Sequence, residues 1–303
     1  METLGKKGVN ASNRLACKGV GRGLKRVSYV MASPKRPSTL PDALTCLGVG
    51  DGWPCADRRH SSFLYRLGGE TILMDCGDGM STAFSRSGVP YDRVDRVFLS
   101  HLHSDHVGGF LMFVQGMWLE RRQRPLVVHM PAEGIEPMRR MLDAVYLFEE
   151  LVGFRLEMKP LEVGKPVRVG AVRVVPHPTS HLADLQNSFG KKYPQAFDCF
   201  SFLMEAPGRR VGHSADIGGL EDLKPLLTKP LDHLTCELAH CELEGICDLL
   251  RGKEIGGVTF IHLARQLWDD LRGTRRLLKA RLGRIPFEIG REGVEMGLGR
   301  IGR

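Results

Sequence analysis

Short apolar runs recur along this chain, and most of them end at glycine, proline or a charged residue. Runs of this kind, rich in β-branched and aromatic side chains, are typical of buried strands. The pattern predicts strands over 63–65, 71–74, 96–100, 126–130, 155–159, 167–175, 199–205, 209–212, 257–262 and 285–289. Two further strands are expected to open the stretches 43–62 and 231–240.

Longer segments with apolar residues at helical spacing separate many of these strands. Helices are expected from Met80 onward and over 108–118, 135–148 and 267–282. Residues 182–198 are expected to form a loop with a basic tip, and residues 290–303 a tail.

Strands and helices alternate in two successive halves, from 43 to about 165 and from about 166 to 303. Helices of this kind bury their apolar sides against a sheet. The order therefore favours an α/β fold with four layers, which are helix, sheet, sheet and helix.

The basic residues of the chain are concentrated at its start. Residues 1–41 hold 9 of the 43 Lys and Arg residues but only one of the 35 acidic residues, which leaves 34 of each downstream. This stretch has no hydrophobic periodicity and is expected to be a disordered tail, followed by a folded domain over 42–303. The balanced charge of that domain gives no argument for a nucleic-acid surface on it.

Nothing in the sequence predicts a membrane segment, because no apolar run reaches the roughly 18 residues of a span. The tail lacks the apolar core of a secretory signal, and the eight cysteines form no CxxC pair. A cytoplasmic location with reduced thiols is therefore expected. An organelle-targeting role for the tail, and a true start at Met31, stay open.

Three histidines and an aspartate follow the strand predicted at 96–100. They are His101, His103, Asp105 and His106. Neutral imidazoles and carboxylates are the ligands of borderline divalent ions such as zinc. The first two histidines sit one residue apart on extended backbone, and the other two residues follow where the chain turns. The loop therefore suggests two metal sites.

This His-x-His-x-Asp-His loop resembles the signature of the metallo-β-lactamase-fold hydrolases. The stretch Leu47-Gly48-x-Gly50, with Pro54 and Arg59-x-Ser61-Ser62, is similar to the N-terminal loop of the ribonuclease Z branch. The resemblance covers roughly the last 260 residues. It implies an αββα sandwich with the metal site at one edge of the two sheets.

The resemblance also implies a ligand set for two divalent ions. One ion would be held by His101, His103 and His181, the other by Asp105, His106 and His262, with Asp216 bridging. His181 is preferred to His177 by its distance from the strand end, and His177 is expected to line or support the site. Asp75 would orient the metal loop. Zinc is the expected ion, with manganese or iron as alternatives.

Two such ions share a water and lower its pKa, which gives hydroxide at neutral pH. The leaving group still needs a proton, and the ribonuclease Z branch supplies it from a histidine downstream. The nearest match is the stretch from Glu237 to His240. We therefore expect His240 to be the general acid and Glu237 to orient it, while Asp105 completes the catalytic residues.

The chain departs from the ribonuclease Z pattern at two places. Ala264 stands where that branch has a serine, and no tRNA-gripping arm is recognisable between His106 and His181. These departures weigh against processing of tRNA precursors.

The sequence thus predicts a dinuclear metal-dependent hydrolase, a ribonuclease Z-like phosphodiesterase that uses metal-bound hydroxide. Its substrate would be RNA, a cyclic nucleotide or a small phosphodiester, and a homodimer is a possible form. A lactonase or thioester hydrolase is an alternative, since hydroxide also attacks carbonyl carbon. Further alternatives are a mononuclear iron enzyme of the same fold that oxidises sulfur compounds, and a non-catalytic binding protein.

Overall fold

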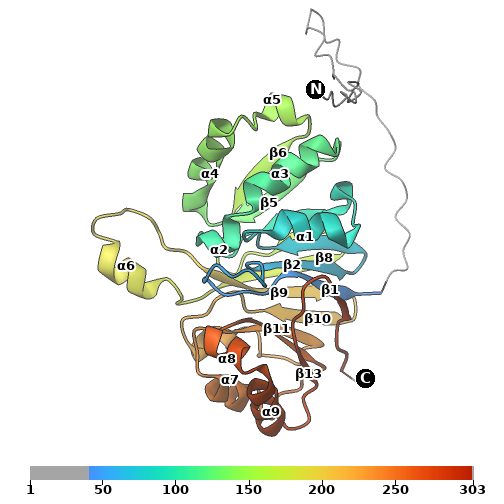
Figure 1. The fold of residues 1–303 in the computed structure, drawn as a ribbon, viewed down its shortest axis with the longest axis vertical. Coiled ribbons are helices and arrows are strands. Elements are labelled where there is room, and N and C mark those ends of the chain that lie inside the picture. The colour runs from blue at the N-terminus through green and yellow to red at the C-terminus, as the bar shows by residue number, and fades with distance from the viewer. Residues whose placement is uncertain (1–40, 302–303) are drawn as a thin grey trace, which may run out of the picture. The chain divides into compact units, whose positions relative to one another are not determined.

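Two sheets packed face to face form the centre of the structure, and helices cover the outer side of each sheet (Figure 1). The computed structural model describes residues 41–301, which lie in one compact unit from Pro37 to Arg303. The tail predicted over 1–41 lies outside the described residues, apart from Pro41. The predicted αββα sandwich is confirmed.

The strands are short, and most of their residues are buried. Their bounds are β1 Ala43–Gly48, β2 Ser62–Leu67, β3 Glu70–Met74, β4 Arg96–Phe98, β5 Leu126–Met130, β6 Leu156–Pro160, β7 Val167–Val169, β8 Val172–Pro178, β9 Phe200–Ala206, β10 Arg209–His213, β11 His233–Leu238, β12 Val258–Leu263, β13 Phe287–Ile289 and β14 Glu295–Gly297. The first sheet has the order β14-β1-β2-β3-β4-β5-β6, and the second has the order β13-β12-β11-β10-β9-β8-β7.

The helices lie mostly in the connections between strands. Their bounds are α1 Met80–Ser87, η1 Tyr91–Arg93, α2 Ser104–Val107, α3 Phe110–Leu119, α4 Ala132–Ala144, α5 Glu149–Val152, α6 Ala183–Phe189, η2 Leu220–Leu223, α7 Leu243–Leu250, α8 Arg265–Asp269 and α9 Leu271–Leu282.

Each sheet contains a run of parallel strands, which fixes where the connecting loops meet. Strands β3, β4, β5 and β6 are parallel to one another in the first sheet. Strands β10, β11, β12 and β13 are parallel in the second sheet. The carboxyl ends of parallel neighbours lie at one edge of a sheet, so the loops after these strands gather there.

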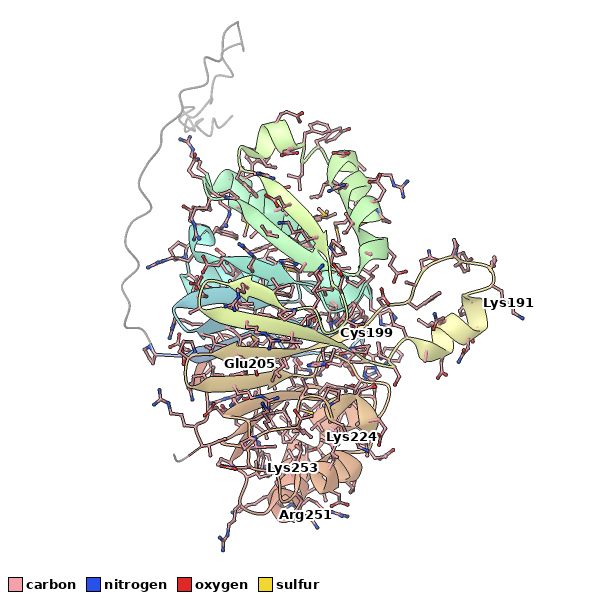
Figure 2. All side chains as sticks on the ribbon, turned by 180° about the vertical axis from the view of Figure 1, so that it is seen from behind. Lys191, Cys199, Glu205, Lys224, Arg251 and Lys253 are labelled. Atoms are coloured by element: carbon pink, nitrogen blue, oxygen red, sulfur yellow. The ribbon has the colours of Figure 1, made fainter. Side chains whose placement is uncertain are left out.

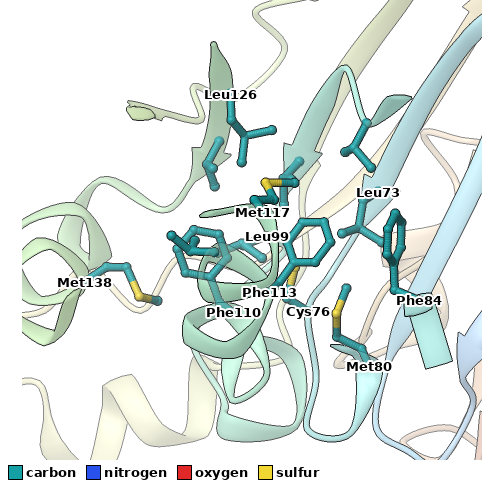
Figure 3. Packing of buried hydrophobic residues seen from close by; sticks show 14 of the residues in the cluster. Leu73, Cys76, Met80, Phe84, Leu99, Phe110, Phe113, Met117, Leu126 and Met138 are labelled. Atoms are coloured by element: carbon teal, nitrogen blue, oxygen red, sulfur yellow. The ribbon is translucent and has the colours of Figure 1, made fainter. Parts of the chain in front are cut away.

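Three hydrophobic cores separate the four layers. One lies between the two sheets and includes Phe63, Tyr65 and Phe202. A second lies between the second sheet and helices α7 and α9. The third lies under the helices of the first sheet, where Phe84, Phe110 and Phe113 pack with sulfur-containing and aliphatic side chains (Figure 3).

Two segments of the second half differ from the prediction. The strand predicted over 167–175 is a hairpin of β7 and β8, because Gly170, with φ of 54°, turns the chain between them. The loop predicted over 182–198 contains helix α6. Its apolar residues Leu182, Leu185 and Phe189 follow helical spacing, which is a signal that the basic tip obscured.

The end of the chain also differs from the prediction. The helix predicted over 267–282 is divided into α8 and α9 at Asp270, whose carboxylate caps α9 by accepting from the N–H of Gly273 at 2.9 Å. The predicted tail contains β14, which pairs antiparallel with β1 so that Met296 lies opposite Leu44. A strand of three residues has no local periodicity, and its pairing partner decides its structure.

No helix in residues 41–301 has both the length and the apolar content that a membrane span requires. All seven cysteines in the described part of the chain are free thiols.

His129 in β5 is a core histidine, and it makes the stability of the fold sensitive to pH. It is 6% exposed, and its ring stacks on Phe98 with centroids 5.1 Å apart. Burial, with smaller contributions from Arg96 and Lys159, lowers its pKa to about 4. Below its ordinary pKa of about 6.5 the unfolded chain therefore binds a proton that the folded chain does not, and stability falls as pH drops toward 4.

We expect His129→Phe to reduce this loss. Between pH 7 and pH 5 the wild type should lose about 1–2 kcal/mol more of its free energy of unfolding than the variant. Urea unfolding of both proteins at the two pH values, with EDTA present throughout, measures the difference. Equal losses in the two proteins would show that His129 titrates normally in the folded state.

Candidate metal centre

All seven predicted metal ligands lie at one edge of the two sheets. His101 and His103 follow β4, and Asp105 and His106 lie in the short helix α2. The others come from the second sheet: His181 follows β8, Asp216 follows β10 and His262 lies in β12.

The side chains of these residues converge in two groups. The first comprises His101, His103 and His181, and the second comprises Asp105, His106, Asp216 and His262. Within each group, one potential ligand atom per residue lies within 4.8 Å of every other. The partition agrees with the predicted one, and the ligand roles themselves stay a prediction.

Asp216 faces both groups. Its Oδ2 atom lies 3.3 Å from Nε2 of His106 in the second group and 3.6 Å from Nε2 of His181 in the first. It also lies 3.4 Å from Nε2 of His262. Burial raises the pKa of Asp216, but the surrounding imidazoles outweigh burial and hold it well below its usual range. The carboxylate is thus charged and lies between the two groups.

The residues present fit divalent ions. The Nε2 atoms of His101 and His106 are buried and have no hydrogen-bond partner within the described chain, although buried polar atoms normally have one. Burial lowers the pKa of His101 well below its usual value and that of His181 to about 4. Both rings are therefore neutral at pH 7 and offer the lone pair that a metal ion requires.

Asp75 and Ser100 fix the orientation of the signature loop. Asp75 Oδ1 accepts from the Ser100 N–H at 2.7 Å, and Asp75 Oδ2 accepts from the Ser100 hydroxyl at 2.9 Å and lies 2.8 Å from Nδ1 of His106. The Ser100 hydroxyl lies 3.0 Å from Nδ1 of His101. With Nδ1 engaged in this way, Nε2 of each histidine faces the centre.

His262 enters the centre through a β-bulge. In the pairing of β11 with β12, Glu237 lies opposite Ile261 and Leu238 opposite Leu263, so His262 is the extra residue. A bulge redirects the side chain of the inserted residue. The Ser61 hydroxyl then lies 2.8 Å from Nδ1 of His262, which leaves Nε2 toward Asp216.

Three non-glycine residues at the centre have a positive φ. They are Asp75 at 59°, Ala215 at 47° and His262 at 47°. Such backbone angles cost roughly 1–3 kcal/mol each and persist where the surroundings impose them. They lie at or beside residues of the centre, and their strained backbone angles orient the side chains of the centre.

Asp222 links the loop that carries His181 to the loop that carries Asp216. Its Oδ2 accepts from the N–H and the hydroxyl of Ser180, each at 2.9 Å, and from the Gly218 N–H at 2.8 Å. Glycine is required at position 218, where the two loops approach each other, because a Cβ there would lie 2.4 Å from the carbonyl carbon of Ser180. The two ligand-bearing loops are therefore held together.

His240 and Glu237 form the pair that the sequence suggested. Nδ1 of His240 lies 2.9 Å from Oε1 of Glu237 and 3.9 Å from Oδ2 of Asp216. Glu237 is fully buried, and its Oε2 also accepts from the N–H groups of Ala239 and His240. Burial lowers the pKa of His240, but Glu237 and Asp216 outweigh burial and raise it to about 9. His240 thus carries a proton at neutral pH.

A cavity of about 500 Å³ lies on the His240 side of the centre. His240 and His262 line it, together with Trp53 and Arg265, whose guanidinium lies 5.8 Å from the Trp53 ring. The cavity gives a substrate access to the proposed acid.

The structure does not bring His177 into either ligand group. It lies within β8 instead of in the loop after it, opposite Ser201 of β9. Burial, with Arg210 and Arg173, lowers its pKa. Within the described residues, no contact between His177 and the ligand groups supports the role predicted for it.

Three supporting residues were missed by the sequence reasoning, namely Ser61, Ser100 and Asp222. Ser61 lies in the Gly-rich loop pattern, and Ser100 directly precedes the signature loop at His101. Asp222 had no such signal, because its partners lie in loops that meet only in the folded chain.

Solved structures share this fold. The metallo-β-lactamase-fold protein YhfI from Bacillus subtilis superposes with a TM-score of 0.65 at 19% identity, covering 84% of this chain and 98% of that one. The short form of human tRNase Z superposes with a TM-score of 0.63 at 15% identity, covering 84% and 99%. Among curated sequences, ribonuclease Z of Methanothermobacter thermautotrophicus is 30% identical over 138 residues, which are 46% of this chain and 44% of that protein. The chain spans about half the length of the curated relatives it matches.

The fold and the two groups of converging ligands define a metallo-β-lactamase-fold metallohydrolase that is distantly related to ribonuclease Z. A sequence model of one family, described as anti-Pycsar protein Apyc1, matches residues 43–227, more than half of the chain. The chain therefore belongs to the Apyc1 family.

Proposed function

We propose that this protein is a dinuclear metal-dependent phosphodiesterase. The observation that carries the proposal is the position of Asp216, whose Oδ2 lies within 4 Å of an imidazole nitrogen from each of the two ligand groups. Such a shared carboxylate suits two neighbouring ions, an arrangement that recurs in phosphatases and nucleases. The likeness to ribonuclease Z supports phosphorus rather than carbonyl carbon as the reacting centre.

In this proposal the first group would hold one ion and the second group the other, with Asp216 as a ligand that both groups could share. Two bound divalent ions would supply positive charge for the phosphodiester oxygens and a water of lowered pKa. Zinc suits the imidazole-rich ligand set, and manganese or iron remain alternatives.

Residues of the chain itself would orient the metal ligands and supply the proton for the leaving group. Asp75, Ser100 and Ser61 hold the imidazoles in the orientation that exposes Nε2. His240, protonated and held by Glu237, would donate a proton to the departing ester oxygen. Each supporting contact fixes a group before substrate arrives, which lowers the cost of reorganisation during the reaction.

A small diester, such as a cyclic nucleotide, is the proposed substrate in preference to a tRNA precursor. Residues 42–303 carry equal numbers of basic and acidic residues, 34 of each. Binding of long nucleic acids depends on neutralising many phosphates with Lys and Arg. A domain without a surplus of cations is better suited to a substrate with few charges.

Metal analysis with parallel substrates tests the proposal. The purified protein should hold about two zinc or manganese ions per chain and hydrolyse bis(p-nitrophenyl) phosphate and cyclic AMP more efficiently than p-nitrophenyl acetate. Removal of the metal by a chelator should abolish turnover, and adding the ion back should restore it. One iron per chain, or ester turnover alone, would contradict the proposal and favour the oxidative or lactonase alternatives.

A further inference from the structure

Helix α9 carries a row of cations that nothing in the proposed chemistry uses. Six residues between 271 and 284 are basic, and none is acidic. Four of the six lie at positions i, i+3, i+4 and i+7, a spacing that places side chains on one face of a helix. These four are exposed and form what we call the α9 basic strip: Arg272, Arg275, Arg276 and Lys279.

The opposite side of α9 is buried, which fixes the strip on the outer surface. Leu278 and Leu282 belong to the core between the second sheet and helices α7 and α9, and Thr274 is buried beside them. The helix lies at the end of the sandwich farthest from α5 (Figure 1). Lys253, which is exposed, adds a cation at the same end (Figure 2).

No carboxylate neutralises the strip within residues 41–301. None of its four side chains forms an ion pair in that part of the chain, and Arg275 acts on the half-buried Glu288 only through its charge. Arg251 and Arg281 differ, because both lie near the carboxylate of Asp248, at 2.9 Å and 3.6 Å. The strip therefore presents positive charge to the solvent.

This charge does not stabilise the helix that carries it. The amino end of a helix is the positive end of its dipole, so a cation in the first turn, such as Arg272, is unfavourable there. Like charges three or four residues apart also repel, and Arg275 has Arg272 on one side and Lys279 on the other. Composition does not explain the strip either, since residues 42–303 hold 34 basic and 34 acidic residues. A bound polyanion would relieve this repulsion.

The surface around the strip favours an anionic lipid bilayer as that polyanion. Among the described residues, the large apolar side chains that are exposed include none from α9 or from the turn that carries Lys253. A protein partner normally covers an apolar centre within a polar rim, and single-stranded nucleic acid is bound on aromatic side chains. A bilayer with anionic headgroups requires only cations on an outer surface.

We propose that the α9 basic strip docks this protein on a membrane surface that contains anionic lipids. The guanidinium groups of the strip pair with phosphate oxygens of the headgroups, and Lys279 and Lys253 add attraction at longer range. The association is peripheral, because the apolar side of α9 is already buried in the core. It does not depend on the chemistry at the metal centre.

Cosedimentation with vesicles tests the proposal. At low ionic strength the full chain should bind vesicles made of equal parts phosphatidylcholine and phosphatidylglycerol, and it should not bind vesicles of phosphatidylcholine alone. The variant Arg275→Gln/Arg276→Gln should bind the mixed vesicles about 30-fold more weakly, roughly fivefold for each cation lost. Glutamine is as compatible with a helix as arginine, so this variant should fold, which far-UV circular dichroism and thermal unfolding check.

Two further variants serve as controls. Arg139→Gln/Arg140→Gln removes two neighbouring exposed arginines from α4, a helix that also carries acidic residues, and should leave vesicle binding within about twofold of wild type. Arg275→Lys/Arg276→Lys keeps both charges and should also bind within about twofold of wild type. The cations of residues 1–41 are the same in every variant, so the differences between variants report the exchanged side chains alone.

Three results would overturn the proposal. The first is equal binding of mixed vesicles by wild type and Arg275→Gln/Arg276→Gln, and the second is an equally large loss in the α4 control, which would indicate a general attraction of the whole chain. The third is no binding of mixed vesicles, or equal binding of neutral ones. If duplex RNA or polyglutamate then bound in a way that required Arg275 and Arg276, the strip would be a nucleic-acid or acidic-protein surface instead.

Discussion

Replacing Asp216 by alanine is expected to remove the bound divalent ions and to lower phosphodiester turnover by about a thousandfold or more. The reason is that one carboxylate serves both ligand groups, with its Oδ2 atom 3.3 Å from His106 Nε2 and 3.6 Å from His181 Nε2. Asp216→Asn keeps the shape of the side chain and removes its charge, so it should show nearly the same loss. Elemental analysis and turnover of bis(p-nitrophenyl) phosphate measure the two effects.

Asp248 offers a matched control for this experiment. It is an aspartate on α7 whose carboxylate is 53% exposed and pairs with Arg251 at 2.9 Å. Asp248→Asn should keep full metal content and full activity. If Asp216→Asn also kept both ions and its activity, the two groups would not share this residue, and the dinuclear proposal would fail.

Replacing His240 by alanine is expected to lower kcat by about 10²- to 10⁴-fold, but only for diesters whose leaving group needs a proton. A cyclic nucleotide releases an alkoxide and should show the full effect. Bis(p-nitrophenyl) phosphate releases a stable phenolate and should be nearly unaffected. The difference between the two substrates is the signature of a general acid, which a purely structural role for His240 would not produce.

Glu237 should set the pH range of this acid. The glutamate raises the pKa of His240 to about 9 through a hydrogen bond of 2.9 Å and its charge. An acid acts only while it holds its proton, so kcat for the cyclic nucleotide should fall as pH rises through that pKa. Glu237→Gln removes the negative charge and should move this fall to lower pH.

His177 supplies the control for both substitutions. It is a histidine of β8 outside the ligand groups, and His177→Ala should leave the leaving-group dependence and the pH profile unchanged. Equal losses on both substrates in His240→Ala would contradict the general-acid role.

The strands and the signature loop could be predicted because their signals are local. A buried strand such as β5 is a continuous apolar run, and the ligands after β4 lie within six residues of one another. Their chemistry follows from residue type and spacing alone. The partition of the remaining ligands came from a family resemblance, and it agrees with the two groups that the structure brings together.

Elements that depend on a distant partner were harder to predict. Strand β14 exists because β1 offers it an edge, and the side chain of Met296 is buried in the core between the sheets. His177 was placed beyond the strand predicted over 167–175, whereas β8 continues through Pro178. Proline is tolerated there, since it removes a donor without preventing extended backbone.

The sequence by itself determined the αββα class and the candidate metal-binding loop, because hydrophobic periodicity and ligand spacing are properties of neighbouring residues. The candidate acid came from the family resemblance. Only the tertiary structure decided how the side chains and loops of the candidate metal centre are oriented. The bulge that turns His262 inward and the Asp222 contact that joins two loops both depend on residues far apart in the chain. Such contacts leave no pattern in the sequence, since their partners are set by how the sheets and loops pack.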